Sequence, residues 1–186
     1  TPTQVTAAIQ EFGIENVKQK FVAANVIPAG FSLPVEWRKD EDLWRSDLEK
    51  LPQISRDMAS IGCFRCFTWV LPCSETRAMD ENIEFHKYRF IPIADLFSDH
   101  GISLGLEFIG PKHLRESQKF PFIHQMAPML QLGKDIGRNV GLLLDCFHWY
   151  TAGETVEAIC GLVNSDIVYV HVNDGVTGRT SDEQRD

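Results

Sequence analysis

Apolar positions along the chain follow two different periods, which predict helices and strands in alternation. Five segments repeat apolar residues at helical spacing, and they predict helices over residues 14–22, 43–61, 83–100, 122–137 and 155–162. Five shorter runs are continuously apolar or rich in β-branched and aromatic residues, and they predict strands over residues 27–33, 64–71, 102–107, 140–145 and 167–171. Gly62 and Gly101 follow two of the helices as stop signals, and Pro92 is expected to kink or start a helix.

Continuous apolar runs, rather than alternating ones, are typical of parallel strands that helices cover on both faces. The regular spacing of the strand ends favours an α/β fold of the (β/α)8 TIM-barrel type. No Gly-rich phosphate-binding loop follows any strand, which removes the strongest argument for a dinucleotide-binding sheet. A complete barrel needs about 250 residues, whereas this chain has 186. We therefore expect one incomplete barrel domain over residues 1–186, with the first strand and the last two strands missing.

Composition and charge narrow the classes of partner. The chain is 44% hydrophobic and carries a formal net charge of -8, from 18 basic and 26 acidic residues, which disfavours nucleic acid as a partner. No apolar run is long enough to cross a bilayer and the N-terminus lacks signal-peptide features, so a soluble cytoplasmic protein is expected. The five cysteines do not resemble a disulfide framework. Cys63 and Cys66 have the spacing of a zinc or redox pair, but packed thiols are favoured because no second pair follows.

Three of the predicted strands end in a residue that can bind a metal: Glu107, Asp145 and His171. Parallel strands of a barrel gather their carboxyl ends at one mouth, so these side chains are expected to meet there. Glu107 alone is equally well explained as a surface carboxylate. Asp145 is more telling, because an unpaired carboxylate after a buried strand would be costly. His148 follows closely and can lean over the same mouth from a loop.

These residues carry a resemblance to a known superfamily. Leu106-Glu107, Leu144-Asp145-Cys146-Phe147-His148 and Val170-His171-Val172-Asn173-Asp174, with Asp182-Glu183-Gln184 downstream, resemble motifs of the sugar phosphate isomerase/epimerase superfamily. Its members adopt the xylose-isomerase-like TIM barrel. The resemblance covers about residues 14–186, and it is specific for the superfamily but not for a substrate.

The resemblance implies one divalent metal ion, commonly manganese, cobalt, magnesium or zinc. Family members bind it through a Glu, an Asp, a His and a second Glu, and Glu107, Asp145 and His171 match the first three. The fourth ligand is expected on a strand beyond Asp186.

The implied activity is epimerisation or aldose–ketose isomerisation of a sugar through an enediolate. A divalent ion would acidify a carbon-bound proton beside a carbonyl, and Glu107 would remove that proton as a base. His148 would hold a substrate oxygen. Trp69 and Phe108 would form apolar walls of the sugar site, although packed core aromatics explain them equally well.

Two further residues, Arg179 and Asp174, are candidates for contact with the substrate and with His171. Family epimerases often place an Arg after the metal-binding histidine, and the nearest candidate for contact with the substrate is Arg179, which lies farther along than in the family. Asp174 could orient His171 by a hydrogen bond, and it could equally cap a turn before Gly175.

Three alternative functions remain open. An inosose-type dehydratase would begin with the same proton abstraction. An abasic-site endonuclease of the same superfamily is disfavoured, since the strand before Val70 offers no histidine and the chain is acidic. A chain ending at Asp186 could also be a non-catalytic metal-binding fragment. A homo-oligomer is expected only by analogy with other barrels.

Overall fold

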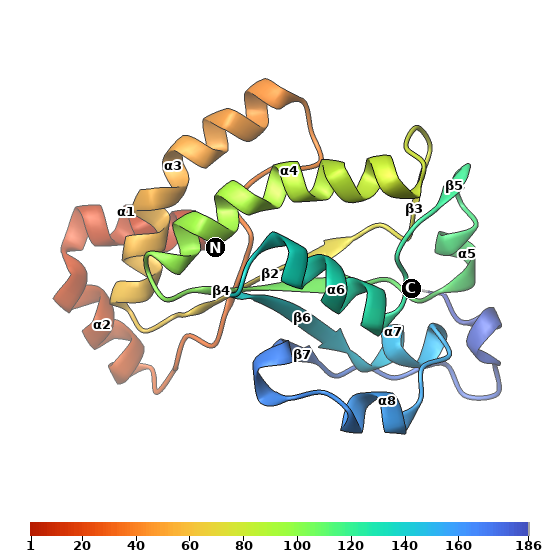
Figure 1. Ribbon diagram of the computed structural model, residues 1–186. Coiled ribbons are helices and arrows are strands. Elements are labelled where there is room, and N and C mark those ends of the chain that lie inside the picture. The colour runs from red at the N-terminus through yellow and green to blue at the C-terminus, as the bar shows by residue number, and fades with distance from the viewer. Residues whose placement is uncertain (186) are drawn as a thin grey trace.

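Five parallel strands form the central sheet of the protein (Figure 1). The computed structural model describes residues 1–185. In the order of the sheet, the strands are β1 (Phe31–Ser32), β2 (Arg65–Val70), β4 (Ser103–Phe108), β6 (Val140–Asp145) and β7 (Ile167–His171). Each of these strands pairs with the next one along the chain, in parallel. This progressive order is that of a barrel wall, because a doubly wound sheet reverses its strand order at a switch point.

Helices cover one face of this sheet. The structure contains α1 (Pro2–Phe12), α2 (Ile14–Ala23), α3 (Glu41–Ser60), α4 (Met79–Ser98), α5 (Lys112–Arg115), α6 (Met126–Ile136), α7 (Cys146–Thr151) and α8 (Val156–Cys160). In Figure 1, α3, α4 and α6 lie on the same side of the strands. A short antiparallel pair, β3 (Cys73–Ser74) with β5 (Phe120–Pro121), lies beyond the carboxyl ends of β2 and β4.

Four of the strands agree closely with the predicted apolar runs, whereas the strand predicted over residues 27–33 is only Phe31–Ser32 and several helix boundaries differ. The helix α4 runs through Pro92, so the prediction that Pro92 starts or kinks a helix is wrong about the start. Phe90, Ile93 and Phe97 are fully buried on both sides of that proline, and their packing offsets the missing backbone hydrogen bond. The predicted helix from residue 122 begins at Met126, where the side chain of Glu154 accepts a hydrogen bond from the backbone N–H of Met126. The helices α1 and α7 and the β3–β5 pair were not predicted.

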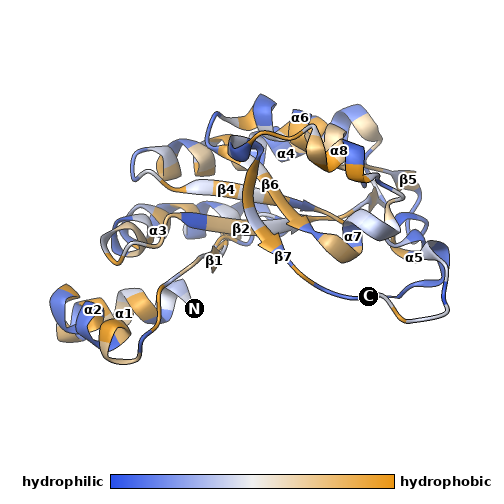
Figure 2. Cartoon of the chain, turned by 90° about the horizontal axis from the view of Figure 1, so that it is seen from below, coloured by the Kyte–Doolittle hydropathy of each residue, from blue (hydrophilic) through white to orange (hydrophobic). Residues whose placement is uncertain are grey.

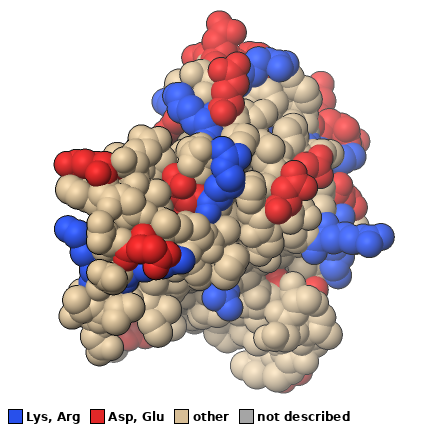
Figure 3. Space-filling view, turned by 90° about the vertical axis from the view of Figure 1, so that its left-hand side faces the viewer, with Lys and Arg blue, Asp and Glu red and all other residues tan. Residues whose placement is uncertain are grey.

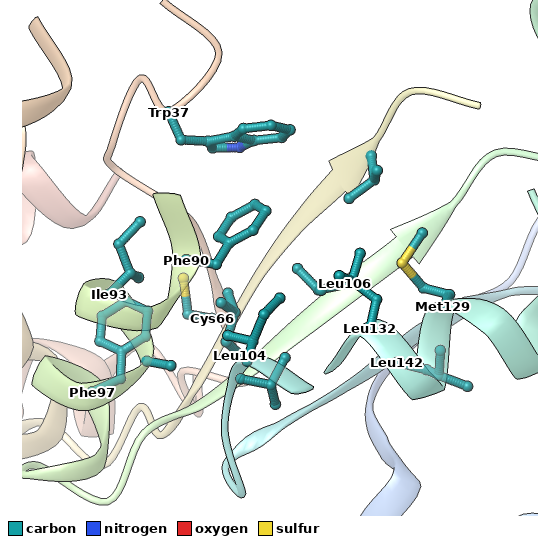
Figure 4. Close-up of a cluster of buried hydrophobic side chains, with 14 of the residues drawn as sticks. Trp37, Cys66, Phe90, Ile93, Phe97, Leu104, Leu106, Met129, Leu132 and Leu142 are labelled. Atoms are coloured by element: carbon teal, nitrogen blue, oxygen red, sulfur yellow. The ribbon is translucent and has the colours of Figure 1, made fainter. Parts of the chain in front are cut away.

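The hydrophobic core lies between the sheet and the three long helices. Even-numbered residues of β2, β4 and β6 point into it, and Figure 4 shows Cys66, Leu104, Leu106 and Leu142 gathered there with side chains from α4 and α6. In Figure 2, β6 and β7 are mostly orange, which marks hydrophobic residues, whereas the segment that leads to the C-terminus contains mostly hydrophilic residues in blue. Cys63 and Cys66 are buried and free, as predicted for packed thiols, and burial raises the pKa of the Cys66 thiol.

Helix hydropathy and the charges of one face (Figure 3) characterise the surface. Among the described residues no helix is both long and apolar enough to cross a bilayer. Figure 3 shows acidic and basic side chains interspersed over one face, so that face has no continuous basic stripe that could follow a phosphate backbone.

One histidine belongs to the core instead of the strand ends. His86 of α4 is 4% exposed, stacks on Phe122 with ring centroids 4.8 Å apart, and bonds through Nδ1 to the carbonyl oxygen of Asn82 at 2.6 Å. Burial lowers the pKa of His86 from 6.5 to about 4, and the positive charges of Arg38 and Arg77 act in the same direction.

This buried histidine predicts a loss of stability in acid. Between pH 6.5 and about pH 4 the unfolded chain binds the His86 proton and the folded chain does not, so the free energy of unfolding falls as the pH drops through that window. The His86 contribution to this loss is roughly 3 kcal/mol at 1.36 kcal/mol per pKa unit. Urea unfolding between pH 4 and 8 should show a weaker pH dependence for His86→Phe. If the free energy of unfolding depended on pH in the same way in the wild type and in His86→Phe, this explanation would be contradicted.

Candidate metal centre

The register of the sheet brings the candidate ligands to one edge. Side chains alternate between the two faces of a strand, so Glu107 of β4 and Asp145 of β6 share the face opposite to the helices. Trp69 pairs with Glu107 in the register of β2 and β4, and Asp145 pairs with His171 in the register of β6 and β7. All four residues lie at or near the carboxyl ends of their strands, as predicted for a barrel mouth.

A register shift determines that a histidine faces this edge. Leu142 pairs with Ile167, but Leu143 pairs with Tyr169, so β7 contains one extra residue at this point. In an unshifted ladder Asp145 would pair with Val170, and His171 would point away from the carboxylates. The bulge therefore supplies the imidazole. The sequence analysis placed His171 correctly without foreseeing this irregularity.

The three predicted ligands converge. The Nδ1 atom of His171 lies 3.3 Å from Oε1 of Glu107 and 3.7 Å from Oδ2 of Asp145. Glu107 is 8% exposed and Asp145 is 6% exposed, so two carboxylates are held with little solvent next to one imidazole. Two ionised carboxylates with so little solvent are costly unless a cation or hydrogen-bond donors compensate their charge.

The two oxygens of Asp145 have different roles. Its Oδ1 accepts hydrogen bonds from the backbone N–H groups of Phe147 at 2.7 Å and His148 at 3.2 Å, and so caps the N-terminus of α7. Its Oδ2 faces His171. The sequence analysis expected a loop here, although an aspartate directly before an apolar and aromatic run is an N-cap signal. The cap orients the carboxylate and begins the helix that carries His148.

His148 lies beside the same carboxylates. It is 6% exposed, and the potential ligand atoms of Glu107, Asp145 and His148 all lie within 4.8 Å of one another. The backbone N–H of Gly110 donates to Nδ1 of His148 at 3.4 Å. A neutral imidazole that accepts at Nδ1 carries its proton on Nε2, and a protonated nitrogen cannot bind a metal. This hydrogen bond favours His148 as a donor to an oxygen atom. Nδ1 of His171 is hydrogen-bonded to Oε1 of Glu107, so it carries a proton before any metal binds. His171 remains a candidate ligand because a metal at Nδ1 would displace that proton, which Nε2 can take.

The donor set fits a divalent cation. Bonds of about 2.1 Å place neighbouring ligand atoms roughly 3.0–3.4 Å apart, close to the separations of 3.3 and 3.7 Å around His171 Nδ1. Two carboxylates with an imidazole are a mixed oxygen and nitrogen set, which suits manganese, cobalt, zinc or magnesium.

The two predicted aromatic walls differ in position. Trp69 faces the same side as Glu107, is 43% exposed, and has the guanidinium of Arg38 stacked over its ring at 3.7 Å. Phe108 is fully buried and belongs to the helix-covered core. The prediction that Phe108 forms a wall of the site is therefore wrong, because strand alternation turns the residue after Glu107 to the other face.

Asp174 and Arg179 lie in the exposed segment after β7. Both line a pocket of about 450 Å³, together with α7 residues such as Trp149 and Tyr150. The thiol of Cys146 holds this segment, since it donates to the carbonyl oxygen of Asn173 at 2.8 Å. The predicted contacts of Asp174 with His171 and of Arg179 with substrate stay predictions.

The whole chain can now be compared with known proteins. A family model described as a xylose isomerase-like TIM barrel matches residues 3–186, and the chain therefore belongs to the xylose isomerase-like TIM barrel family. The superfamily and the incomplete barrel inferred from the sequence are confirmed. No curated protein sequence matches the chain.

Solved structures agree on the fold. A xylose isomerase domain protein from Alicyclobacillus acidocaldarius is 29% identical, with a TM-score of 0.86, over 97% of this chain and 63% of its own. A zinc-containing IolI protein is 15% identical, with a TM-score of 0.72, over 95% of this chain and 62% of its own. A D-psicose 3-epimerase, solved in the presence of D-fructose, is 15% identical, with a TM-score of 0.67, over 94% of this chain and 65% of its own. The chain thus spans less than two thirds of each of these proteins.

Gly110, two residues after β4, lies in close contact with α7, and this contact leads to a prediction about stability. A Cβ at Gly110 would overlap with the carbonyl oxygen of His148 and the hydroxyl of Thr151. We expect Gly110→Ala to lower the free energy of unfolding by about 1–3 kcal/mol, as for other overpacked sites. Gly161→Ala is a matched control, because its Cβ would meet ordinary contacts at 3.4 Å. Equal urea midpoints for the two variants would show that this close approach is not required.

Proposed function

We propose that the protein is a metal-dependent isomerase or epimerase of a ketose or related sugar. The observation that carries this proposal is the convergence of His171 Nδ1 on Glu107 and Asp145, two buried carboxylates at the ends of parallel strands. Membership of the xylose isomerase-like family supports it. Structural neighbours named as a D-psicose 3-epimerase and a 3-keto-D-glucoside 4-epimerase from E. coli fit the same class of reaction.

Glu107, Asp145 and His171 would hold one divalent ion, and no fourth ligand is assigned among the described residues. The chemistry that such an ion would supply is the polarisation of a substrate carbonyl and its neighbouring hydroxyl, which would acidify the carbon-bound proton beside them. A neighbour solved as the IolI protein with zinc supports a metal of this kind. The N-cap bonds fix Asp145 before any ion arrives, so little ordering is needed on binding.

Glu107 would act as the base. Its carboxylate takes the proton from the carbon beside the carbonyl, and the electron pair of that C–H bond moves into the carbon skeleton to give an enediolate. A second acid, expected beyond the described residues, returns a proton to the other face of that carbon or to the neighbouring carbon. The first outcome is epimerisation and the second is isomerisation.

His148 and Trp69 would position the sugar. The proton on Nε2 of His148, required by the hydrogen bond from Gly110, can be donated to a substrate oxygen. The exposed ring of Trp69 offers an apolar surface next to Glu107. We keep Arg179 as a candidate contact to the substrate and Asp174 as a candidate partner of His171. A small-molecule sugar as partner, a homo-oligomer and a cytoplasmic location belong to the same proposal.

The base role of Glu107 predicts the behaviour of a conservative variant. In the full-length protein, Glu107→Gln should slow the incorporation of solvent deuterium into a panel of ketoses by about 10²- to 10⁴-fold. Glu116→Gln, at an exposed carboxylate, is the matched control and should exchange at the wild-type rate. Mass spectrometry of the sugars measures the exchange. Wild-type exchange by Glu107→Gln would exclude Glu107 as the base.

The same assay separates the dehydratase alternative. A dehydratase shares the abstraction by Glu107 but eliminates water, so a product that absorbs as a conjugated dione would replace the isomerised sugar. Deuterated sugar without such absorbance supports the proposed isomerase.

The ligand role of Asp145 predicts a loss of metal without a loss of fold. Asparagine keeps an oxygen that can accept the two N-cap hydrogen bonds, whereas it removes the negative charge. Asp145→Asn should therefore retain its circular dichroism spectrum and lose most of its bound metal, compared with about one ion for each wild-type chain. Metal analysis of the dialysed full-length proteins measures this. Equal metal content in the two proteins would refute the assignment.

A further inference from the structure

A second pocket, with a volume of about 220 Å³, is lined by Arg38, whose guanidinium also lies over the ring of Trp69. It is bounded by Trp37 and Arg38 before α3, by the turn from Cys73 to Arg77, and by the first turns of α4. This volume is below that of a typical site for a drug-sized ligand, so it suits a small molecule or one end of a larger one.

Two guanidinium groups line this pocket. Arg38 stacks between Trp37, at 4.2 Å, and Trp69, at 3.7 Å, and donates through its terminal nitrogen to the carbonyl oxygen of Trp69. Arg77 stacks over the ring of Phe85 at 3.9 Å. Such stacking leaves the edges of a guanidinium for hydrogen bonds to an oxyanion.

Neither guanidinium forms an ion pair with a described carboxylate, and the hydrogen bonds of Arg38 go to the carbonyl oxygen of Trp69 and the hydroxyl of Thr68. No carboxylate oxygen of the described residues lies within 4.0 Å of either guanidinium. Burial lowers the pKa of Arg38 to about 10, although the charge of Glu36 opposes that shift, and the group remains protonated near neutral pH. Glu75 also lines the pocket but is exposed, so the lining holds two positive charges against one screened negative charge.

Neutral groups complete the lining. The hydroxyl of Ser74 accepts from the backbone N–H groups of Thr76 at 3.4 Å and Arg77 at 3.1 Å, so its own proton can be donated to a ligand. His86 donates through Nδ1 to a carbonyl oxygen and therefore offers Nε2 as an acceptor for a ligand hydroxyl. A ligand with an oxyanion and a hydroxyl group matches this arrangement.

We propose that this pocket, with Arg38, Arg77 and Ser74, binds the oxyanionic group of a small hydroxylated molecule, either a phosphate monoester or a carboxylate. The planar fork of an arginine matches both anions, and stacking on aromatic rings holds each fork in place before the ligand arrives. This binding does not depend on the metal centre or on the proposed reaction.

The test uses the full-length protein after chelator treatment, with the fluorescence of Trp37 and Trp69 beside Arg38 as the reporter. At constant ionic strength, inorganic phosphate should produce a saturable change, and sorbitol 6-phosphate should bind at least tenfold more tightly than sorbitol. The affinity for gluconate is compared with the affinity for sorbitol in the same way. A preference for gluconate indicates a carboxylate ligand, and a preference for sorbitol 6-phosphate alone indicates a phosphate monoester. Equal affinity for sorbitol and both charged compounds would overturn the proposal.

Variants locate the binding. Arg77→Gln should weaken the binding of the preferred anion at least tenfold, while Arg56→Gln, at an exposed arginine of α3 that bonds to Gln53, should leave it within twofold. Arg38→Lys keeps the positive charge but loses the planar fork, and it should also weaken binding at least tenfold. Unchanged affinity in folded Arg77→Gln and Arg38→Lys would overturn the proposal.

Discussion

The pairing of β6 with β7 is the constraint on which the candidate metal centre depends. Parallel strands alternate their side chains between two faces, so a shift of one residue exchanges the groups that reach the mouth. The extra residue in β7 places His171, and not Val170, opposite Asp145. Gly141 lets β6 lie close to the chain that enters β7, because a Cβ at this position would lie 2.7 Å from the carbonyl oxygen of Asp166, just before β7. Gly141 and the bulge beside it lie several residues before the carboxyl ends of these strands. Together they determine that His171 meets the carboxylates at the carboxyl ends.

Asp145 links the fold to the chemistry. One of its oxygens satisfies two backbone N–H groups at the start of α7, and the other faces His171. The helix that this cap begins carries His148, whose Nδ1 accepts a hydrogen bond from Gly110 at the end of β4. Two strands and one short helix are therefore tied together by backbone hydrogen bonds around the carboxylates. The site is organised by the chain itself, which lowers the cost of ordering ligands when a metal binds.

The sequence predicted β4, β6 and β7 well because each is an apolar run that ends near a polar residue, as at Asp145 and His171, whereas only Phe31–Ser32 of the run over residues 27–33 forms a strand. It located Glu107, Asp145, His148 and His171 for the same reason, since a strand end is visible in the order of residues. It could not show the bulge in β7, which depends on contacts between strands. It also turned Phe108 to the wrong face, where strand alternation should have been applied. The pocket beside Arg38 was missed, because its residues come from three separated segments and share no motif.

The central claim is that Glu107, Asp145 and His171 hold one divalent ion at the barrel mouth. Anomalous X-ray diffraction from crystals of the full-length protein grown with manganese tests it most directly. The account predicts one strong peak bonded at about 2.1 Å to both carboxylates and to Nδ1 of His171, with His148 outside bonding distance. A peak bound to His148 in place of His171, or no peak between the two carboxylates, would contradict it.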